Sequence, residues 1–134
     1  MSRVADTEEA TTTEETTEEV SVSLAADFFF ASGEWKLSAK GKAKVEALGT
    51  KIAERGATAV TVTGHTDSVP DKRIGNDELS KRRAQTVADL IEKAAPGVKV
   101  TVEGRGQSEP VASNGTDAGK AKNRRVTVDY EVAK

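Results

Sequence analysis

Residues 60–83 change from a strand pattern to a helix pattern across one polar connection. The segment begins with valines that alternate with threonines, which is typical of a half-buried strand, and it ends in an amphipathic helix pattern. The connection, residues 64–75, contains too much Gly, Asp, Pro and Lys to be buried. It carries an acid, Asp67, and leads into a helix that carries a base, Arg83. Because polar side chains on loops between rigid elements are frequent binding sites, we expect a site for a small zwitterionic ligand here.

The rest of the sequence adds regular elements on both sides of this segment. Alternating apolar and polar residues predict strands over residues 20–24, 58–64, 98–102 and 126–132. Apolar residues at helical spacing predict helices over 38–54 and 76–94, with Ser38 and Asn76 as their N-caps. A long loop is expected over residues 104–119. This order, β-α-β-α-β-β, predicts an α+β fold with a four-stranded mixed sheet and helices packed on one face.

The N-terminal segment has a different composition from the rest. Residues 1–19 consist largely of Thr and Glu and contain few apolar side chains. Such a segment cannot bury enough apolar surface to offset the chain entropy lost on folding. We therefore expect residues 1–19 to be a disordered Thr/Glu-rich linker and residues 20–134 to form a single domain.

The overall charge and hydropathy exclude some partners. The net charge is −2 with both signs interspersed, which gives no electrostatic reason to expect a nucleic acid as partner. No apolar run approaches the ~20 residues that span a bilayer. The N-terminus also lacks the pattern of a signal peptide. A membrane is therefore expected as a partner only through an upstream segment that this sequence does not include.

The sequence contains no cysteine, and His65 is its only histidine. Disulfides, thiol nucleophiles and thiolate metal ligands are therefore absent, and most imidazole-rich metal sites are excluded. A Ser-His-Asp triad would depend on His65, which we expect to lie on the side away from Asp67 and to pack or hydrogen-bond there. We predict no catalytic residues, no metal site and no cofactor.

Asp67 and Arg83 each have a simpler interpretation that the sequence leaves open. Asp67 could serve only to make an Asx-turn with its own backbone. Arg83 could be solvated, as its neighbours Lys81 and Arg82 are expected to be, but it lies beside the apolar stripe of the helix and immediately precedes Ala84. Its rigid guanidinium suits a carboxylate bound by two hydrogen bonds. Together, Asp67 and Arg83 could hold the ammonium and the carboxylate of one amino-acid centre.

The same region also contains a series of spaced motifs. In order, they are Gly64-His65-Thr66-Asp67, then Asn76, Leu79, Ser80, Arg83 and Ala84, then Gly104-Arg105-Gly106-Gln107, and finally Asn123-Arg124-Arg125-Val126. With this series, residues 20–133 resemble the OmpA-like peptidoglycan-binding domain. That domain is shared by outer membrane protein A, the peptidoglycan-associated lipoprotein and the flagellar stator protein MotB.

The resemblance implies a βαβαββ fold that binds peptidoglycan without a covalent bond, at the meso-diaminopimelate residue of its stem peptide. It implies a place in the bacterial cell envelope, periplasmic or facing the cell wall, where the domain would anchor its host protein. Asp67 and Arg83 would hold the amino and carboxylate groups of diaminopimelate. The neighbours of the site would be Thr66, Asn76, Leu79, Asn123, Arg124 and Arg125.

Two positions depart from the family pattern, and two alternative functions stay open. The family commonly has Phe-Asp where this sequence has Phe30-Ala31, and Gly-Arg where it has Gly119-Lys120. The loss of an acid at Ala31 favours the alternative of a structural or oligomerising domain with weak or lost ligand binding. The other alternative is a wall hydrolase that pairs Asp67 with Asp71 or Glu103. The host protein and the oligomeric state are not readable from the sequence.

Overall fold

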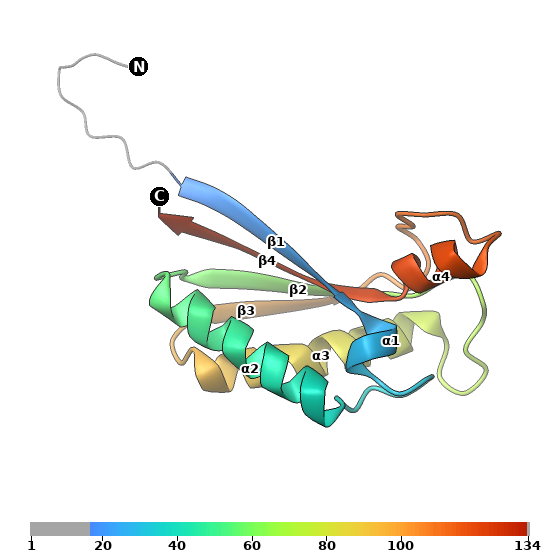
Figure 1. Ribbon diagram of the computed structural model, residues 1–134, viewed down its shortest axis with the longest axis horizontal. Helices are drawn as coiled ribbons and strands as arrows, with labels where there is room; N and C mark the ends of the chain where they lie inside the picture. Colours follow the sequence, from blue (N-terminus) through green and yellow to red (C-terminus); the bar gives the residue numbers. More distant parts are fainter. Residues whose placement is uncertain (1–16, 134) are drawn as a thin grey trace, which may run out of the picture.

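The computed structural model describes residues 17–133 of the chain, which form one four-stranded sheet with two long helices against one of its faces (Figure 1). The strands are β1 (Thr17–Ala25), β2 (Ala59–His65), β3 (Lys99–Gly104) and β4 (Arg125–Ala133). The long helices are α2 (Ala39–Glu54) and α3 (Asn76–Ala94). The short helices are α1 (Ala26–Phe29) and α4 (Asp117–Asn123).

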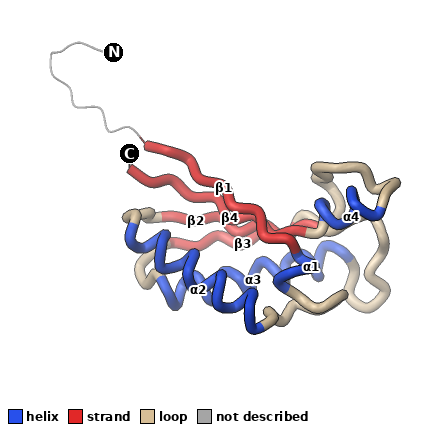
Figure 2. Tube along the Cα trace, viewed as in Figure 1, coloured by secondary structure: helices blue, strands red, loops and turns tan. Residues whose placement is uncertain are grey.

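The sheet has the order β1-β4-β2-β3. The last strand, β4, lies between β1 and β2 (Figure 2). It runs antiparallel to both, whereas β2 and β3 are parallel. Since β1 and β2 both run antiparallel to β4, the C-terminal ends of β1 and β2 lie at the same end of the sheet. The predicted α+β fold with a mixed sheet and helices on one face is confirmed.

Several boundaries differ from those that the sequence predicts. The strand β1 begins at Thr17, so residues 17–19, which the prediction placed in the linker, pair with the end of β4. The remainder of the predicted linker lies outside the described residues. The predicted loop 104–119 ends in the short helix α4, whose N-cap Thr116 accepts a hydrogen bond from the N–H of Gly119 at 3.0 Å. Short helices of this kind have too few turns to show a 3.6-residue pattern.

The core lies between the sheet and the two long helices. Alternation along β4 turns Val126, Val128 and Val132 to the helices, and α3 contributes Val87 and Ile91, all of them buried. The predicted cap of α2 is confirmed, because Oγ of Ser38 accepts a hydrogen bond from the N–H of Gly41 at 3.0 Å. The apolar faces that the sequence predicts for α2 and α3 are therefore the faces that pack against the sheet.

The first turns of α3 lie unusually close to the ends of β2 and β3. A side chain at Gly64 would collide with the carbonyl group of Ser80, and one at Gly104 would lie 2.9 Å from the carbonyl oxygen of Asp77. The hydroxyl of Ser80, which is fully buried, donates to that Asp77 oxygen at 2.8 Å and accepts from the N–H of Gly106 at 3.0 Å. Glycine is required at both strand ends because the helix backbone leaves no room for a Cβ.

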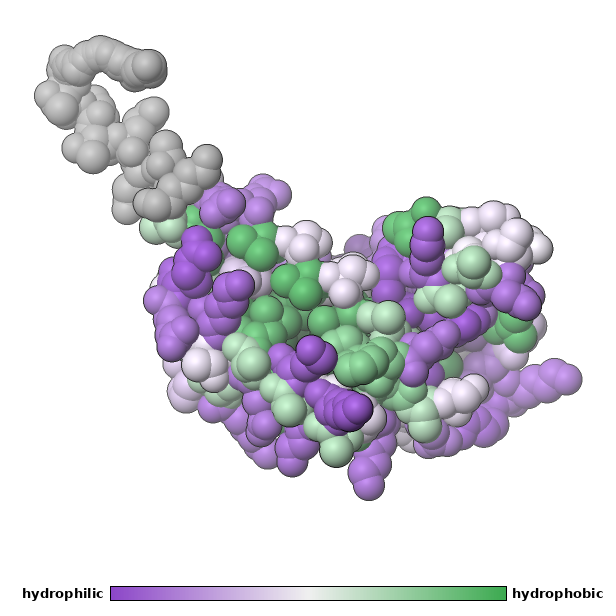
Figure 3. All heavy atoms as spheres, viewed as in Figure 1, coloured by the Kyte–Doolittle hydropathy of each residue, from purple (hydrophilic) through white to green (hydrophobic). Residues whose placement is uncertain are grey.

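The surface seen in Figure 3 is hydrophilic around a strip of hydrophobic residues over β1 and α2. Val20, Val22 and Leu48 are half-buried residues that pack against the core from these two elements. None of the helices within residues 17–133 has the length and hydropathy of a membrane-spanning segment.

Candidate functional site

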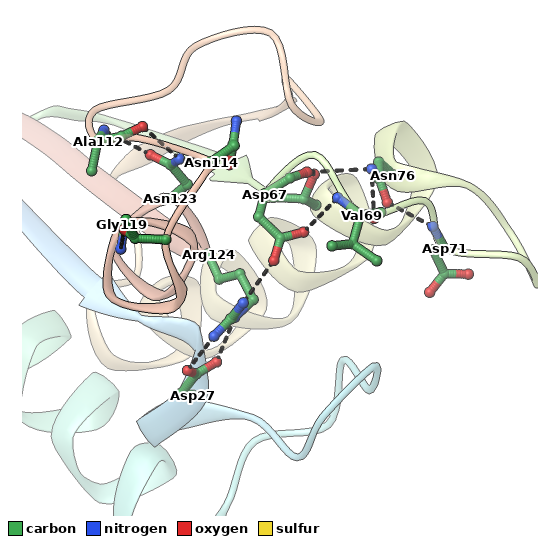
Figure 4. A network of polar contacts seen from close by, with 12 residues as sticks. Asp27, Asp67, Val69, Asp71, Asn76, Ala112, Asn114, Gly119, Asn123 and Arg124 are labelled. Carbon is green, nitrogen blue, oxygen red and sulfur yellow. Dashed lines mark hydrogen bonds and ion pairs between the residues drawn. The ribbon is translucent and has the colours of Figure 1, made fainter.

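A pocket of about 670 Å³ lies where the polar connection after β2 meets the start of α3. Residues in and next to α1 and α4 complete its wall, and Figure 4 shows two of them, Asp27 and Arg124. Its charged lining residues are Asp27, Asp67, Asp71, Arg83, Asp117, Lys120 and Arg124. The pocket is therefore lined by four carboxylates and three cations. A mixed lining of this kind suits a zwitterion better than a simple anion or a polyanion such as nucleic acid.

Asp67 follows the last residue of β2 by two positions and is almost fully buried. Its Oδ1 accepts a hydrogen bond from the N–H of Val69 at 3.0 Å, which is an Asx-turn. Its Oδ2 accepts a hydrogen bond of 2.6 Å from Nη1 of Arg124 (Figure 4). The turn that the sequence left as an alternative is present, and the carboxylate also makes a charged contact inside the pocket.

Asn76 holds the connection between β2 and α3 in shape, and it is not the N-cap that the sequence predicts. The N-cap position is Gly75, and Asn76 is the first residue of the helix. The Asn76 side chain accepts from the N–H of Asp71 at 3.0 Å and donates to the carbonyl of Val69 at 3.1 Å (Figure 4). Gly75 adopts a positive φ of 85°, which glycine tolerates and which lets the chain enter α3 directly.

Arg83 lies on α3 with its guanidinium directed into the pocket wall, and it is only 4% exposed. Its Nε donates a hydrogen bond of 2.7 Å to the carbonyl of Glu34, and its guanidinium carbon lies 5.2 Å from the ring centre of Phe30. Burial lowers the pKa of Arg83 from its usual value. Among residues 17–133, nothing hydrogen-bonds to its Nη1 or Nη2, so both nitrogens can bind a carboxylate.

Arg82, which the sequence predicts to be a solvated neighbour, is held at the surface by other side chains. Its Nε donates to the carboxylate of Glu78 at 2.9 Å, and its guanidinium carbon lies 4.7 Å from the ring centre of Trp35. It does not line the pocket. The two consecutive arginines of α3 therefore differ in direction, and Arg83 alone faces the site.

Arg124 follows the last residue of α4, and it links two acids of the pocket. Its Nε and Nη2 donate to the carboxylate of Asp27 at 2.9 and 2.8 Å, while its Nη1 donates to Asp67 (Figure 4). Hydrogen bonds from Arg124 lower the pKa of Asp27, and those to Asp27 raise the pKa of Arg124. Arg124 was expected near the site only from the resemblance, and the structure places it inside the pocket.

Of the other expected neighbours, Thr66, Asn76 and Leu79 line the pocket, whereas Asn123 and Arg125 do not. The Asn123 side chain accepts from the N–H groups of Val111 and Ala112 at 2.8 and 3.0 Å, so it shapes the loop before α4. Figure 4 shows it beside Ala112 and Asn114. Arg125 donates to the carbonyls of Asn123 and Glu109 at 3.3 and 3.1 Å on the sheet face away from the helices. Neighbouring residues of an extended strand point to opposite sides, which separates Arg125 from Arg124.

His65 is buried next to Arg125 in the sheet and does not line the pocket, as the sequence predicts. Its Nδ1 lies 3.9 Å from the carboxylate of Glu109 and has no hydrogen-bond partner within the described part of the chain. Burial lowers the pKa of His65, with a further contribution from the charge of Arg125.

Sequence reasoning missed Asp27 as a pocket residue. The acid that the family pattern led us to look for would have stood at Ala31, which is exposed and lies outside the pocket lining. Asp27 lies in α1, two residues after the end of β1, and β1 ends at the same end of the sheet as β2. The sequence did show an acid shortly after the first predicted strand. Only the strand order reveals that the end of β1 lies near Asp67.

The carboxylates offer little support for hydrolysis. Asp71 lines the pocket, but Glu103 does not, and Glu103 pairs with Arg105 at 3.0 Å. A general acid needs a raised pKa, whereas the pKa of Asp71 is lowered by hydrogen bonds from the N–H groups of Ile74 and Arg73. The pKa of Asp27 is lowered too. The geometry favours binding of charged groups over proton transfer.

Comparison with known proteins agrees with this arrangement. Residues 29–124 match the model of the OmpA family. The lipoprotein YfiB of Escherichia coli is 34% identical over 110 residues, which cover 81% of this chain and 68% of YfiB. The peptidoglycan-binding protein ArfA of Mycobacterium tuberculosis is 43% identical over 70 residues, which cover 52% of this chain and 21% of ArfA. The chain thus spans about two thirds of one relative and about a fifth of the other.

Among solved structures, the cell wall anchor of the type VI secretion system from Pseudomonas aeruginosa superposes with a TM-score of 0.77 and 30% identity. The match covers 90% of this chain and 88% of the anchor. The family match covers most of the described residues, and the solved structure superposes over most of the chain. The chain belongs to the OmpA family.

Proposed function

We propose that this domain binds peptidoglycan without a covalent bond, through the diaminopimelate residue of the stem peptide, and so anchors its host protein to the cell wall. The observation that carries this proposal is the pocket in which Asp67 and Arg83 face a shared space. Diaminopimelate has an amino-acid centre at the end of its side chain, so it presents an ammonium and a carboxylate together. A mixed-charge pocket can bind both groups at once.

Arg83 is the proposed partner of the ligand carboxylate. Its Nε is already used by the carbonyl of Glu34, which fixes the guanidinium plane, and its two terminal nitrogens remain for the ligand. A planar fork fixed in this way binds a carboxylate with two parallel hydrogen bonds at little further entropic cost. The ring of Phe30 below the guanidinium excludes water from one side.

Asp67 is the proposed partner of the ligand ammonium. Its Asx-turn and its contact with Arg124 hold the carboxylate in one orientation before the ligand arrives. Its side chain is 9% exposed, so an ammonium beside it would make a largely desolvated ion pair. Preorganised charged contacts in such a setting contribute to specificity as well as to affinity.

The relatives support both the ligand class and the location. ArfA is named as a peptidoglycan-binding protein, and the Pseudomonas structure is described as a cell wall anchor. Other relatives are named as lipoproteins and as outer membrane porin F. We infer that this domain works in the bacterial cell envelope, on the side that faces the wall.

The direct test is binding to purified sacculi, followed by affinity measurements with a muropeptide that contains diaminopimelate. We expect wild-type protein to bind sacculi and to be released by added muropeptide. Asp67→Asn keeps the shape and removes the charge, and it should cost on the order of 2–5 kcal/mol of binding free energy. Arg83→Lys keeps the charge but removes the fork, and it should weaken binding by at least about tenfold, or ~1.4 kcal/mol.

Arg82→Lys is the matched control, because it makes the same replacement one residue earlier, at a side chain outside the pocket. Melting temperatures of all variants show whether they still fold. If Arg82→Lys abolishes binding while Arg83→Lys leaves it intact, the carboxylate partner has been assigned wrongly. Soluble fragments released from the sacculi would instead favour a hydrolase, and a folded protein that does not bind would favour a structural domain.

A further inference from the structure

The pocket contains a chain of three charged side chains, Asp27, Arg124 and Asp67, in which the two acids share one guanidinium (Figure 4). The sharing is unequal. Two donor groups of Arg124, Nε and Nη2, bind Asp27 as a fork, and only Nη1 reaches Asp67. Arg124 is thus held in place chiefly by Asp27.

Asp67 alone with Arg124 would form a neutral ion pair. At 2.6 Å the contact is a short charge-assisted hydrogen bond, and it would reduce the attraction of Asp67 for any ligand ammonium. Asp27 changes the net charge of this group, because it places a second carboxylate beside the Arg124 guanidinium. With Asp27 ionised, the three side chains together carry a charge of −1, and one unit of negative charge stays available to the ligand.

We propose that Asp27 is a positioning and specificity-determining residue, which holds Arg124 in place and balances its charge so that Asp67 can bind a cationic group of the ligand. This inference rests on the function proposed above. It also assigns a ligand preference, since the site should favour a stem-peptide residue with a free amino group over the same residue with that amine neutralised.

The burial of the three side chains agrees with this division of roles. The Asp27 side chain is 55% exposed, that of Arg124 is 31% exposed, and that of Asp67 is 9% exposed. The acid that is shielded from water is the one that has most to gain from a ligand ammonium. Asp27 lies at the solvent-facing end, where it can be replaced without leaving a buried charge unpaired.

Asp27 also acts on the other half of the site. Burial lowers the pKa of Arg83, and among its charged neighbours Asp27 raises that pKa while Arg124 lowers it. Arg83 is buried, so it senses these neighbours more strongly than an exposed side chain would. The charge of Asp27 thus offsets that of Arg124 at both positions, and its proposed effect on ligand binding is the one at Asp67.

The test compares two probes, a muropeptide with free diaminopimelate and the same muropeptide with its side-chain amino group acetylated. Wild-type protein should prefer the free amine. Asp27→Asn should weaken binding of the free-amine probe by about tenfold and change binding of the acetylated probe much less. The ratio of the two affinities should therefore be smaller in Asp27→Asn than in wild type. Asp117→Asn is the matched control, because it removes the same charge from the pocket rim at an acid outside the three-residue chain, and its effect should be smaller.

A double-mutant cycle then separates action through Arg124 from direct contact with the ligand. In an Arg124→Gln background, Asp27→Asn should change affinity for the free-amine probe by less than about twofold, because its effect passes through the guanidinium. An undiminished effect in that background would overturn the positioning role. So would equal losses for both probes, or equal losses in Asp27→Asn and Asp117→Asn.

The two proposals fail in different ways. If folded wild-type protein binds neither probe, the proposed function falls, and the role of Asp27 falls with it. If wild-type protein binds and prefers the free amine while Asp27→Asn behaves the same, the proposed function stands and the role of Asp27 is overturned. Melting temperatures of each variant exclude unfolding as the cause of a loss.

Discussion

The two halves of α3 have different roles, one in the pocket and one in the core, although they belong to one continuous helix. The second half places Val87, Ala88 and Ile91 against the sheet, where all three are fully buried. The first half carries Leu79 and Arg83 to the pocket, and it is held by backbone contacts at Ser80. The core half is fixed by apolar area, whereas the pocket half is fixed by the fit of its backbone against glycines and by hydrogen bonds.

This difference predicts that the two halves respond differently to mutation. A core side chain of the second half contacts apolar residues and does not line the pocket. Its loss should therefore reduce the free energy of unfolding and leave ligand binding unchanged. A change near Gly64 moves the helix backbone itself, so it should affect both stability and binding. A change on the exposed side of the helix should affect neither by much.

The largest expected effect is on stability, in the core half. Ile91→Ala should lower the free energy of unfolding by ~2–5 kcal/mol, because it leaves a cavity at a fully buried position. Chemical denaturation measures this loss, and muropeptide affinity of the folded protein should stay within about twofold of wild type. A loss below ~0.5 kcal/mol would mean that the apolar face of α3 is not where the structure places it.

A smaller loss of stability, joined to a loss of binding, is expected where the two regions meet. Gly64→Ala introduces a Cβ that collides with the carbonyl group of Ser80, so α3 must shift away from β2. Overpacking of this kind typically costs ~1–3 kcal/mol. Since Arg83 lies three residues after Ser80, the shift should also weaken muropeptide binding. Unchanged affinity in a destabilised Gly64→Ala protein would show that the pocket tolerates movement of α3.

The smallest effect is expected at Arg82, on the outer side of the pocket half. Arg82→Ala removes an exposed ion pair with Glu78 and a stacking contact with Trp35, which together contribute on the order of 0.5 kcal/mol. The melting temperature and the muropeptide affinity should both stay close to those of wild type. A binding loss as large as that of Arg83→Lys would show that the segment around Trp35 takes part in the site.

Most of the regular elements could be read from periodicity. The bounds of α3 agree with the prediction, and α2 begins after Ser38 as expected, because both helices carry apolar stripes long enough to be recognised. The role of Asn76 could not be read in this way. An Asn before a helix pattern is a good N-cap, yet here the positive φ of Gly75 lets the helix begin at Asn76, and its side chain is used by the preceding loop.

The sequence by itself determined the strands, the long helices, the polar connection that carries Asp67, and the position of Arg83 beside the apolar stripe. These features depend on local patterns of side chains, which a reader of the sequence can see. Only the tertiary structure decided that β4 lies between β1 and β2, and that Arg124 therefore reaches both Asp27 and Asp67. Strand alternation by itself separates Arg125 from Arg124, but the tertiary structure decided that Arg124 is the one that reaches the pocket. The physical reason is that strand order, and contacts between residues 57 and 97 positions apart, depend on packing of the whole chain, which no local pattern records.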